Sequence, residues 1–476
     1  MRQRLLRSAI GLAGASLLAG VAFAIPVSAG ASHLVTMCGQ NITSGGTWTV
    51  ANDIGPCPVS GTGPALQAGI QISHSGVTLN VAGHQITGSD TTNTTPNEQV
   101  GIVLANVQKV VVNGQNGSIS GFDAGLAVEG GGHNNVNGLI VQDNIAHVDE
   151  TGGVPGSNGN PQQNPCNFGD GILTDNSSNN VISNNVATHN GPFSGIALVD
   201  NSLGNLVTQN TASRQTVPNT IGLTTAPGYT SGPCGPFGAN IVGPGRPDQD
   251  EGIRIEGPGA QHNTVDNNSS WGNMLEGIAV HSHVCDSSPS FGGPPPTGDN
   301  SYNTVSNNQA FDDGNDPFAA HMSNGIALLQ QGPAGVVCTS DHETLTGNTV
   351  YNNANDGIYL GGRDSGFNTV TNNSAHNNYN NGVELIARSM ESNGNFQLGS
   401  NNDTITSNTV TANGHDGFLD GLGATNNAYS QNTATGNHTN TGTFPTGYDA
   451  EDVNTACDSN AWNADTFGTV SQSCIH

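Results

Sequence analysis

A short unit that recurs about every 25 residues limits the folds open to this chain more than any other feature. Each copy consists of a polar residue, a glycine, a branched apolar residue, a variable position and, in most copies, a second apolar residue. The copies begin at Asp170, Ser194, Glu251, Glu276, Asn324, Asp356, Asn381 and Asp416, with looser ones starting at Gly101 and Gly125. Spacings without an insertion are 24, 25 and 25 residues (Gly171 to Gly195, Gly252 to Gly277 and Gly357 to Gly382). A fixed period of this length indicates repeated units that stack on one another.

A second unit, Asn-Thr-Val-x-x-Asn in its commonest form, lies between the copies of the first. Its final asparagine recurs at one equivalent place, at Asn185, Asn210, Asn268, Asn308, Asn348, Asn373, Asn408 and Asn432. Asparagine tolerates a left-handed backbone, and stacked asparagines can hydrogen-bond to one another. We therefore expect an asparagine ladder at one corner of a stack of coils.

Apolar and polar residues alternate over four to six positions within both units, which predicts strands with one buried face. Two or three such strands in 22–25 residues leave no room for the helix of a β-α-β crossover. Each coil must instead return to its start and stack about 4.8 Å along an axis. The sequence thus predicts an all-β solenoid, a parallel β-helix of about ten or more coils with loop insertions. A leucine-rich repeat is excluded by the missing leucine register, and a propeller by its longer repeat.

The first residues have the pattern of an export signal. Arg2, Arg4 and Arg7 precede an apolar stretch from about Ala9 to Ala24, and small residues follow near Ala29. We expect a signal peptide over residues 1–31, a β-helix domain over 32–476, and a secreted protein. The apolar stretch is short for a permanent membrane anchor.

Eight cysteines in an exported chain are read first as disulfides. We expect Cys38 to pair with Cys57 and Cys457 with Cys474, so that each bond closes one end segment of the solenoid (near 38–57 and 457–474). The remaining four lie in stretches that interrupt the repeat, and Cys166–Cys234 and Cys285–Cys338 are plausible pairs among several. Zinc binding by these cysteines is less favoured than disulfide formation, because no Cys-x-x-Cys spacing occurs.

The formal net charge is −27, with Lys109 as the single lysine and only 9% of residues charged. Nucleic acids and anionic lipids require lysine and arginine to neutralise phosphate, so we expect neither as a partner. A polyanionic substrate is also less favoured, unless a local basic patch or bound cations offset the negative electrostatic potential of the protein. We expect a monomer.

The repeats resemble those of the right-handed parallel β-helix superfamily, which includes pectate-lyase-like enzymes and NosD-like proteins. The segment from Val77 to Gly88 resembles an opening coil of such proteins, and the resemblance extends from about Cys38 to His438. It implies a single-stranded, right-handed helix. The superfamily contains lyases, hydrolases, epimerases and non-catalytic members, so the resemblance identifies no activity. The Asp-Pro-His-Glu run of mannuronan epimerases is absent, as is the Asn-Thr-Asp, Gly-His-Gly and Arg-Ile-Lys set of polygalacturonases.

Insertions interrupt the period mostly just before or after the Gly-Ile strand. They span Asp149–Gly169, Arg214–Asp250, Ser282–Asn300, Asp312–Ser323, Gln330–Asp341 and Ser389–Ser400. Insertions of a solenoid often wall a binding groove, so this strand is the candidate floor. Its branched residues point inward, and the residues before the glycine and two and four positions after it point outward.

The outward positions supply the candidate site residues. Candidate catalytic residues are Glu251, Glu276, His281, Asp356 and Arg363, and candidate substrate-binding residues are Arg254, Glu256, Tyr359, Glu384 and Arg388. Glu251 and Glu276, one coil apart, are expected about 5 Å from each other, a spacing that suits a retaining glycosidase. A lyase or epimerase would instead use a base such as His281 or Arg363 and Tyr359 as the acid. In the structural alternative, the acids cap turns and the arginines pair with them.

The sequence thus favours a secreted protein that binds an extracellular polysaccharide and, as an enzyme, would cleave or modify it as a hydrolase or lyase. A non-catalytic carbohydrate-binding or surface-adhesive solenoid and a NosD-like accessory protein stay open as alternatives. No cofactor is required by any motif, and the histidines show no metal-ligand spacing. Calcium is a candidate at Asp312-Asp313-Gly314-Asn315-Asp316, where a solvated acidic loop is the alternative.

Overall fold

The computed structural model describes residues 33–58, 67–89, 99–144, 170–191, 194–214, 249–257, 259–282, 299–314, 323–330, 340–362, 365–386 and 400–476. The predicted signal peptide and Cys166, Cys234, Cys285 and Cys338 lie outside these ranges. Residues His33–His476 form one compact unit.

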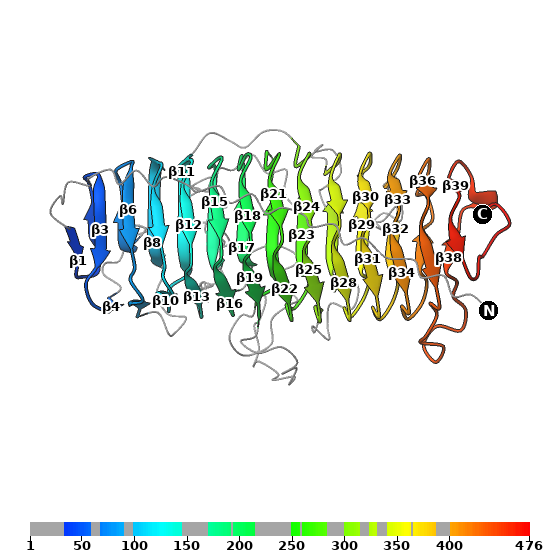
Figure 1. The fold of residues 1–476 in the computed structure, drawn as a ribbon, viewed down its shortest axis with the longest axis horizontal. Coiled ribbons are helices and arrows are strands. Elements are labelled where there is room, and N and C mark those ends of the chain that lie inside the picture. Colours follow the sequence, from blue (N-terminus) through cyan, green and yellow to red (C-terminus); the bar gives the residue numbers. More distant parts are fainter. Residues whose placement is uncertain are drawn as a thin grey trace, which may run out of the picture. The chain divides into compact units, whose positions relative to one another are not determined.

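Within the described ranges, the strands form three parallel sheets of 14, 13 and 13 strands (Figure 1). Sheet I, which carries the Asn-Thr-Val unit, consists of β1 (His33–Val35), β3 (Gly46–Val50), β6 (Val77–Asn80), β9 (Val111–Asn113), β12 (Asn135–Asn137), β15 (Val181–Ser183), β18 (Leu206–Thr208), β21 (Thr264–Asp266), β24 (Thr304–Ser306), β27 (Thr344–Thr346), β30 (Thr369–Thr371), β33 (Thr404–Thr406), β36 (Ala428–Ser430) and β39 (Ala461–Asn463). Sheet II consists of β4 (Ile54–Cys57), β7 (Gln85–Gly88), β10 (Ser118–Ser120), β13 (Ile140–Gln142), β16 (Val186–Thr188), β19 (Thr211–Ser213), β22 (Ser269–Trp271), β25 (Gln309–Phe311), β28 (Thr349–Tyr351), β31 (Ser374–His376), β34 (Thr409–Thr411), β37 (Thr433–Thr435) and β40 (Thr466–Phe467). Sheet III, which carries the Gly-Ile unit, consists of β2 (Gln40–Ile42), β5 (Gln67–Ile72), β8 (Gln99–Gln108), β11 (Ala124–Gly132), β14 (Ile172–Asp175), β17 (Ser194–Val199), β20 (Glu251–Glu256), β23 (Ile278–Ser282), β26 (Ile326–Gln330), β29 (Ile358–Gly362), β32 (Val383–Ile386), β35 (Phe418–Asp420) and β38 (Ala450–Asp452).

The prediction of a parallel β-helix is confirmed, because each strand pairs with the equivalent strand one coil earlier and one coil later. Inward side chains of all three sheets form one continuous apolar core, in which identical positions stack; Val265, Val305 and Leu345 are one such column. Most three-residue strands bury only their central side chain, so each coil depends on its neighbours for stability.

The number of coils agrees with the prediction of about ten or more, and each described coil of the middle part has three strands. The end strands of sheet III, β2 and β38, lack the Gly-Ile unit, so the repeat does not mark the coils at the two ends. The segment from Val77 to Gly88 is not the first coil, since β1 and β3 precede β6 in sheet I.

The expected asparagine ladder is present between sheets I and II. The backbone N–H and the side-chain amide of Asn348 both donate to Oδ1 of Asn373, at 2.9 Å each, and Asn373 donates in the same way to Asn408. The second amide hydrogen of Asn373 reaches the carbonyl of Leu345, one coil back, at 3.0 Å. Both polar atoms of each buried side chain are therefore satisfied, and the turn amides with them.

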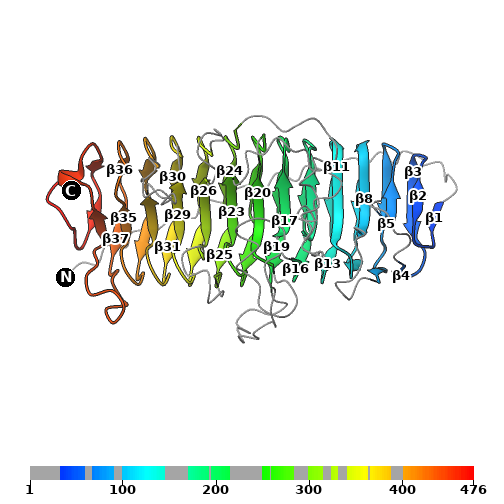
Figure 2. The same cartoon turned by 180° about the vertical axis from the view of Figure 1, so that it is seen from behind.

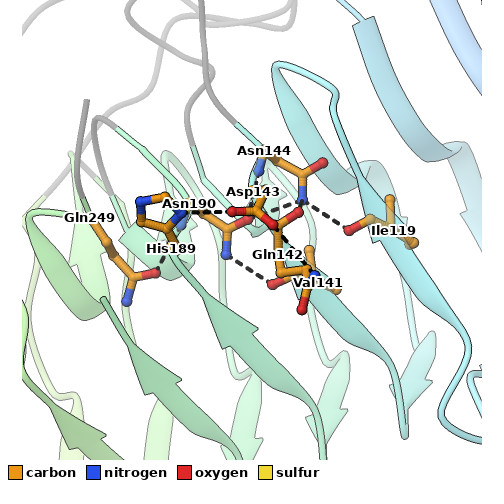
Figure 3. A network of polar contacts seen from close by, with 8 residues as sticks. All are labelled: Ile119, Val141, Gln142, Asp143, Asn144, His189, Asn190 and Gln249. Carbon is orange, nitrogen blue, oxygen red and sulfur yellow. Dashed lines mark hydrogen bonds and ion pairs between the residues drawn. The ribbon is translucent and has the colours of Figure 1, made fainter. Parts of the chain in front are cut away.

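Two further ladders occupy the other two corners, and the sequence did not reveal them. One precedes the sheet I strands, with Asn134, Asn180, Asn205, Asn263, Asn303, Glu343, Asn368, Asp403, Asn427 and Asn460 as its members. The other follows the sheet II strands, with Asn144, Asn190, Gln249, Asn273, Asp313, Asn353, Asn378, Asn413, Asn437 and Asp449. Figure 3 shows its first steps, in which Gln249 takes the place of an asparagine.

Asp313, part of the candidate calcium loop, belongs to this third ladder. Its Oδ1 accepts from the backbone and side chain of Asn273, at 2.9 and 2.8 Å, and its own N–H donates to Asn353. Burial raises the pKa of the Asp313 carboxyl well above its usual value. Asn315 and Asp316, the rest of that loop, lie outside the described residues.

Both disulfides expected at the ends are present. Cys38 pairs with Cys57 in β4, and Cys457, in the short 3-10 helix η3 (Thr455–Cys457), pairs with Cys474. Such bonds are typical of an oxidising, extracytoplasmic compartment. Among the described residues, no helix is long and apolar enough to cross a membrane.

The ladder makes a quantitative prediction for Asn373→Ala. The substitution removes the acceptor of two Asn348 donors and leaves both buried, so we expect the free energy of unfolding to fall by about 2–4 kcal/mol. Asn372→Gly is the matched control, because Asn372 is exposed with a φ of 56°, which glycine adopts freely. Guanidinium denaturation of the three proteins measures the difference. Equal losses in both variants would contradict a structural role for the ladder.

Candidate functional site

The predicted directions of the side chains in the Gly-Ile strands are confirmed. Ile253 and Ile255 of β20, which lies between β17 and β23 in sheet III (Figure 2), are in the central core, so Arg254 and Glu256 project from the outer face. The position before the glycine, which Glu251 occupies, lies on the same face, because Val100 and Ala124 at this position pack with Val103 and Ala127 outside the central core. This face is nevertheless nearly inaccessible, with only 5% of Glu251 and 7% of Arg254 exposed. The outward direction was predictable, whereas the burial was not.

Three of the candidate catalytic residues converge on this face. Ile253 pairs with Ile278, which places Glu251 and Glu276 at the same position of successive coils, and Glu256 pairs with His281. One ligand-capable atom each of Glu251, Glu276 and His281 lies within 4.8 Å of the other two. We call these three residues the Glu–Glu–His cluster. The expected spacing of about 5 Å between the two carboxyl groups agrees with this geometry.

The two glutamates of the cluster differ in their hydrogen bonds. Ser194 Oγ donates to Glu251 at 3.1 Å, whereas Glu276, which is 0% exposed, accepts no hydrogen bond from any other described residue at either carboxylate oxygen. Burial raises the pKa of Glu251 to about 7, although the nearby Arg254 lowers it. Burial and then the Glu251 carboxylate raise the pKa of Glu276 well above its usual value. The pair therefore holds a proton near neutral pH.

Arg254 lies beside the cluster and is held by two carboxylates. Its guanidinium lies 3.3 Å from Asp170 and forms an ion pair with Glu256. This ion pairing agrees with the structural alternative, in which the arginines pair with neighbouring acids and do not bind a substrate. Asp170 was not among the candidates, although it begins the first Gly-Ile unit and thus occupies the same outward column as Glu251. Asp170 could have been identified from the sequence, because it precedes the glycine of its unit just as Glu251 does.

Asp356, Tyr359 and Glu384 form a separate group further along the sheet. Asp356 is two coils beyond Glu276, about 10 Å at the usual strand spacing. Its carboxylate accepts hydrogen bonds from the side chain of Asn355 and the backbone of Asn381. Burial and the Glu384 carboxylate raise the pKa of Asp356 well above its usual value.

Not every candidate can be placed. Arg363 and Arg388 lie outside the described residues, as do most of the insertions expected to wall a groove. Their predicted roles stay predictions.

The sequence also missed a second group with three potential ligands, His415, Asp416 and Glu451. His415 Nδ1 lies 3.2 Å from Asp416 Oδ2, and burial raises the pKa of Asp416 to about 8. Glu451 comes from the last coil of sheet III, where no Gly-Ile unit marks the strand. Both this group and the Glu–Glu–His cluster offer carboxylate and imidazole donors that could hold a cation.

Aromatic side chains form two stacks along the helix. In one stack His262, Tyr302, His342 and Phe367 follow one another at 5.2, 4.9 and 5.2 Å between ring centroids. In the other Trp271, Phe311, Tyr351 and His376 do so at 6.2, 4.8 and 5.1 Å. Each inner ring covers the faces of its neighbours, so the stacks present ring edges along most of their length. They therefore differ from the open ring faces on which a sugar stacks.

Comparison with known proteins supports the fold and leaves the activity open. The sequence matches no protein-family model. No curated protein matches it. Among solved structures, the Dettilon tailspike protein is similar with a TM-score of 0.51 and 15% identity over 91% of this chain and 61% of that one. This chain thus spans less than two thirds of the tailspike.

Two epimerases are also among the similar solved structures. The periplasmic alginate epimerase AlgG has a TM-score of 0.50 and 12% identity over 82% of this chain and 75% of its own. The A-module of the Azotobacter vinelandii mannuronan C-5 epimerase AlgE6 has a TM-score of 0.45 and 12% identity over 91% of each chain. At 12% identity, the likeness to AlgG shows a shared fold and nothing further.

Glu276→Gln tests how much the buried carboxyl pair lowers the free energy of unfolding. The folded protein keeps a proton on this pair at a pH where the unfolded chain has lost it, so stability falls as the pH rises from 4.5 towards 7. In buffer containing a chelator, we expect the variant to match wild type near pH 4.5 and to exceed it by about 1–3 kcal/mol at pH 8. Thermal unfolding at the two pH values measures the effect.

Glu256→Gln is the contrasting variant. It removes a partner of the buried Arg254, so it should lower the stability at pH 8. A Glu276→Gln protein less stable than wild type at pH 8 would show that the buried carboxyl pair does not destabilise the folded protein.

Proposed function

We propose that the protein is secreted, binds an extracellular polysaccharide along the outer face of sheet III, and cleaves or modifies it at the Glu–Glu–His cluster. The observation that carries this proposal is the convergence of the three cluster residues within 4.8 Å, in a chain with only 9% charged residues. Side chains with shifted pKa values that converge on one point are typical of functional sites.

The cluster has the groups that bond cleavage in a polysaccharide requires. In hydrolysis, the protonated carboxyl of one glutamate would donate to the leaving oxygen while the other, ionised, would attack the sugar; about 5 Å between them suits retention. In elimination, His281 would remove the proton next to a uronate carboxyl. The pKa of Glu251, about 7, suits proton transfer near neutral pH.

Two further observations are consistent with this proposal. The alginate epimerase AlgG, which acts on a polysaccharide, uses a similar fold, although at 12% identity. The two disulfides fit a protein that works outside the cytoplasm.

A non-catalytic binding role is the second candidate, and the burial of the face favours it. Glu276 is 0% exposed, and the charge of Arg254 is balanced by Asp170 and Glu256. With these charged side chains buried, a polysaccharide would contact only the more accessible side chains of the outer face of sheet III, such as Tyr359. A binding protein would retain a polysaccharide without changing it.

A panel of neutral and uronic polysaccharides separates the two roles. We expect one of them to yield new reducing ends, with ultraviolet absorbance from an unsaturated product only if the reaction is an elimination. Glu251→Gln and Glu276→Gln should each lower the rate by about 100-fold or more. Glu129→Gln is the control, because Glu129 is a carboxyl on β11 of the same sheet whose burial raises its pKa to about 7.

The outcomes are distinct. Retention of a polysaccharide without any product would refute turnover and favour the binding role. Turnover that persists in both cluster variants would place the chemistry elsewhere on the chain.

A further inference from the structure

We infer that the Glu–Glu–His cluster is a binding site for one divalent transition-metal ion of the zinc class, held by Glu251, Glu276 and His281. This inference goes beyond the proposed function, because it holds whether or not the protein changes a polysaccharide.

The first support is the arrangement of the donors. Glu251 belongs to β20, His281 belongs to the adjacent strand β23, and Glu276 lies just before β23; their ligand atoms lie within 4.8 Å of one another. In a tetrahedral site with bonds of about 2.0–2.1 Å, ligand atoms are separated by about 3.4 Å. Side-chain rotations that move the donor atoms by about 1 Å would therefore allow all three to bind one ion. One coordination position of that ion would stay open.

The second support, independent of the first, is Glu276 itself. Its side chain is 0% exposed, and neither carboxylate oxygen accepts a hydrogen bond from another residue of the described ranges. A buried carboxylate without partners is costly, and buried charges are normally paired or coordinate metals. A cation between Glu276 and Glu251 would satisfy both.

The third support is the local charge. Asp170, Glu251, Glu256 and Glu276 surround a single arginine, Arg254, whose guanidinium pairs with Asp170 and Glu256. When both are ionised, the two cluster glutamates carry two formal negative charges that repel each other. One divalent ion would neutralise them.

The donor set indicates which kind of ion. Calcium takes six to eight oxygen ligands and magnesium keeps most of its waters, whereas an imidazole with two carboxylates suits zinc and its neighbours in the first transition row. Three protein ligands with an open fourth position are typical of catalytic zinc sites.

Isothermal titration calorimetry of the chelator-treated full-length protein with ZnCl₂, MnCl₂ and CaCl₂ tests the inference. We expect one zinc ion per chain at this site and calcium binding at least about tenfold weaker. Glu276→Gln and His281→Ala should each weaken zinc binding by about tenfold or more. Cobalt(II) substituted for zinc should show visible absorption bands that change in His281→Ala. Circular dichroism verifies that each variant is folded.

Two control variants make the result specific. Glu129→Gln alters a half-buried carboxyl on the same sheet but outside the cluster, and zinc affinity should not change. His415→Ala alters the other group of potential ligands and should leave this binding event in place. Absence of zinc binding by the wild-type protein at 100-fold molar excess would overturn the inference. So would undiminished binding in Glu276→Gln and His281→Ala, or binding lost only in His415→Ala.

If the cluster variants do not fold, the wild-type protein still decides the matter. Anomalous scattering at the zinc edge, measured from crystals grown with ZnCl₂, would locate the ion. A peak between Glu251, Glu276 and His281 supports the inference, and zinc bound only elsewhere overturns it.

Discussion

The hydrogen bonds between corner asparagines of successive coils are the interaction on which the rest of this structure depends. Most strands of sheets I and II have three residues and bury one side chain, too little apolar surface for a coil to be stable alone. At each corner the chain must turn, and its backbone N–H groups would be buried without partners. The ladders provide those partners one coil further on, so the turn of each coil is completed by the next.

This constraint also fixes which residues meet. Because the ladders and the strand pairing allow one register only, residues 25 positions apart are adjacent in space wherever no insertion intervenes. Glu251 and Glu276 meet for this reason. Their proximity has an energetic cost, since burial disfavours two like charges, and the fold tolerates it because the surrounding coils are held by many independent hydrogen bonds. A functional cluster can thus be placed on a face of the solenoid without affecting its core.

Periodicity alone was enough to predict the fold, the inward and outward side chains of the Gly-Ile strands, and one ladder. The other two ladders were not recognised, because Glu343, Asp403, Gln249 and Asp313 replace asparagine in them and obscure the pattern. The Asp170–Arg254 pair joins residues 84 positions apart across a long insertion, which no local period reveals. The proximity of Glu251 and Glu276 followed from the repeat, whereas their burial depends on the folded environment of the outer face.

The ladders also have a direction. In the ladder between sheets I and II, each asparagine from Asn185 to Asn432 donates through its backbone and side chain to the residue one coil closer to the C-terminus. Two of the ladders, as far as the described residues show, end in Asp465 and Asp449, which accept both hydrogen bonds and have no side-chain amide to pass on. An aspartate is nevertheless compatible with a further coil, because Asp313 and Asp403 lie within ladders that continue through their backbone N–H groups. Duplicated coils could therefore be added within the helix or after these aspartates, provided that each new coil offers an acceptor at the corner.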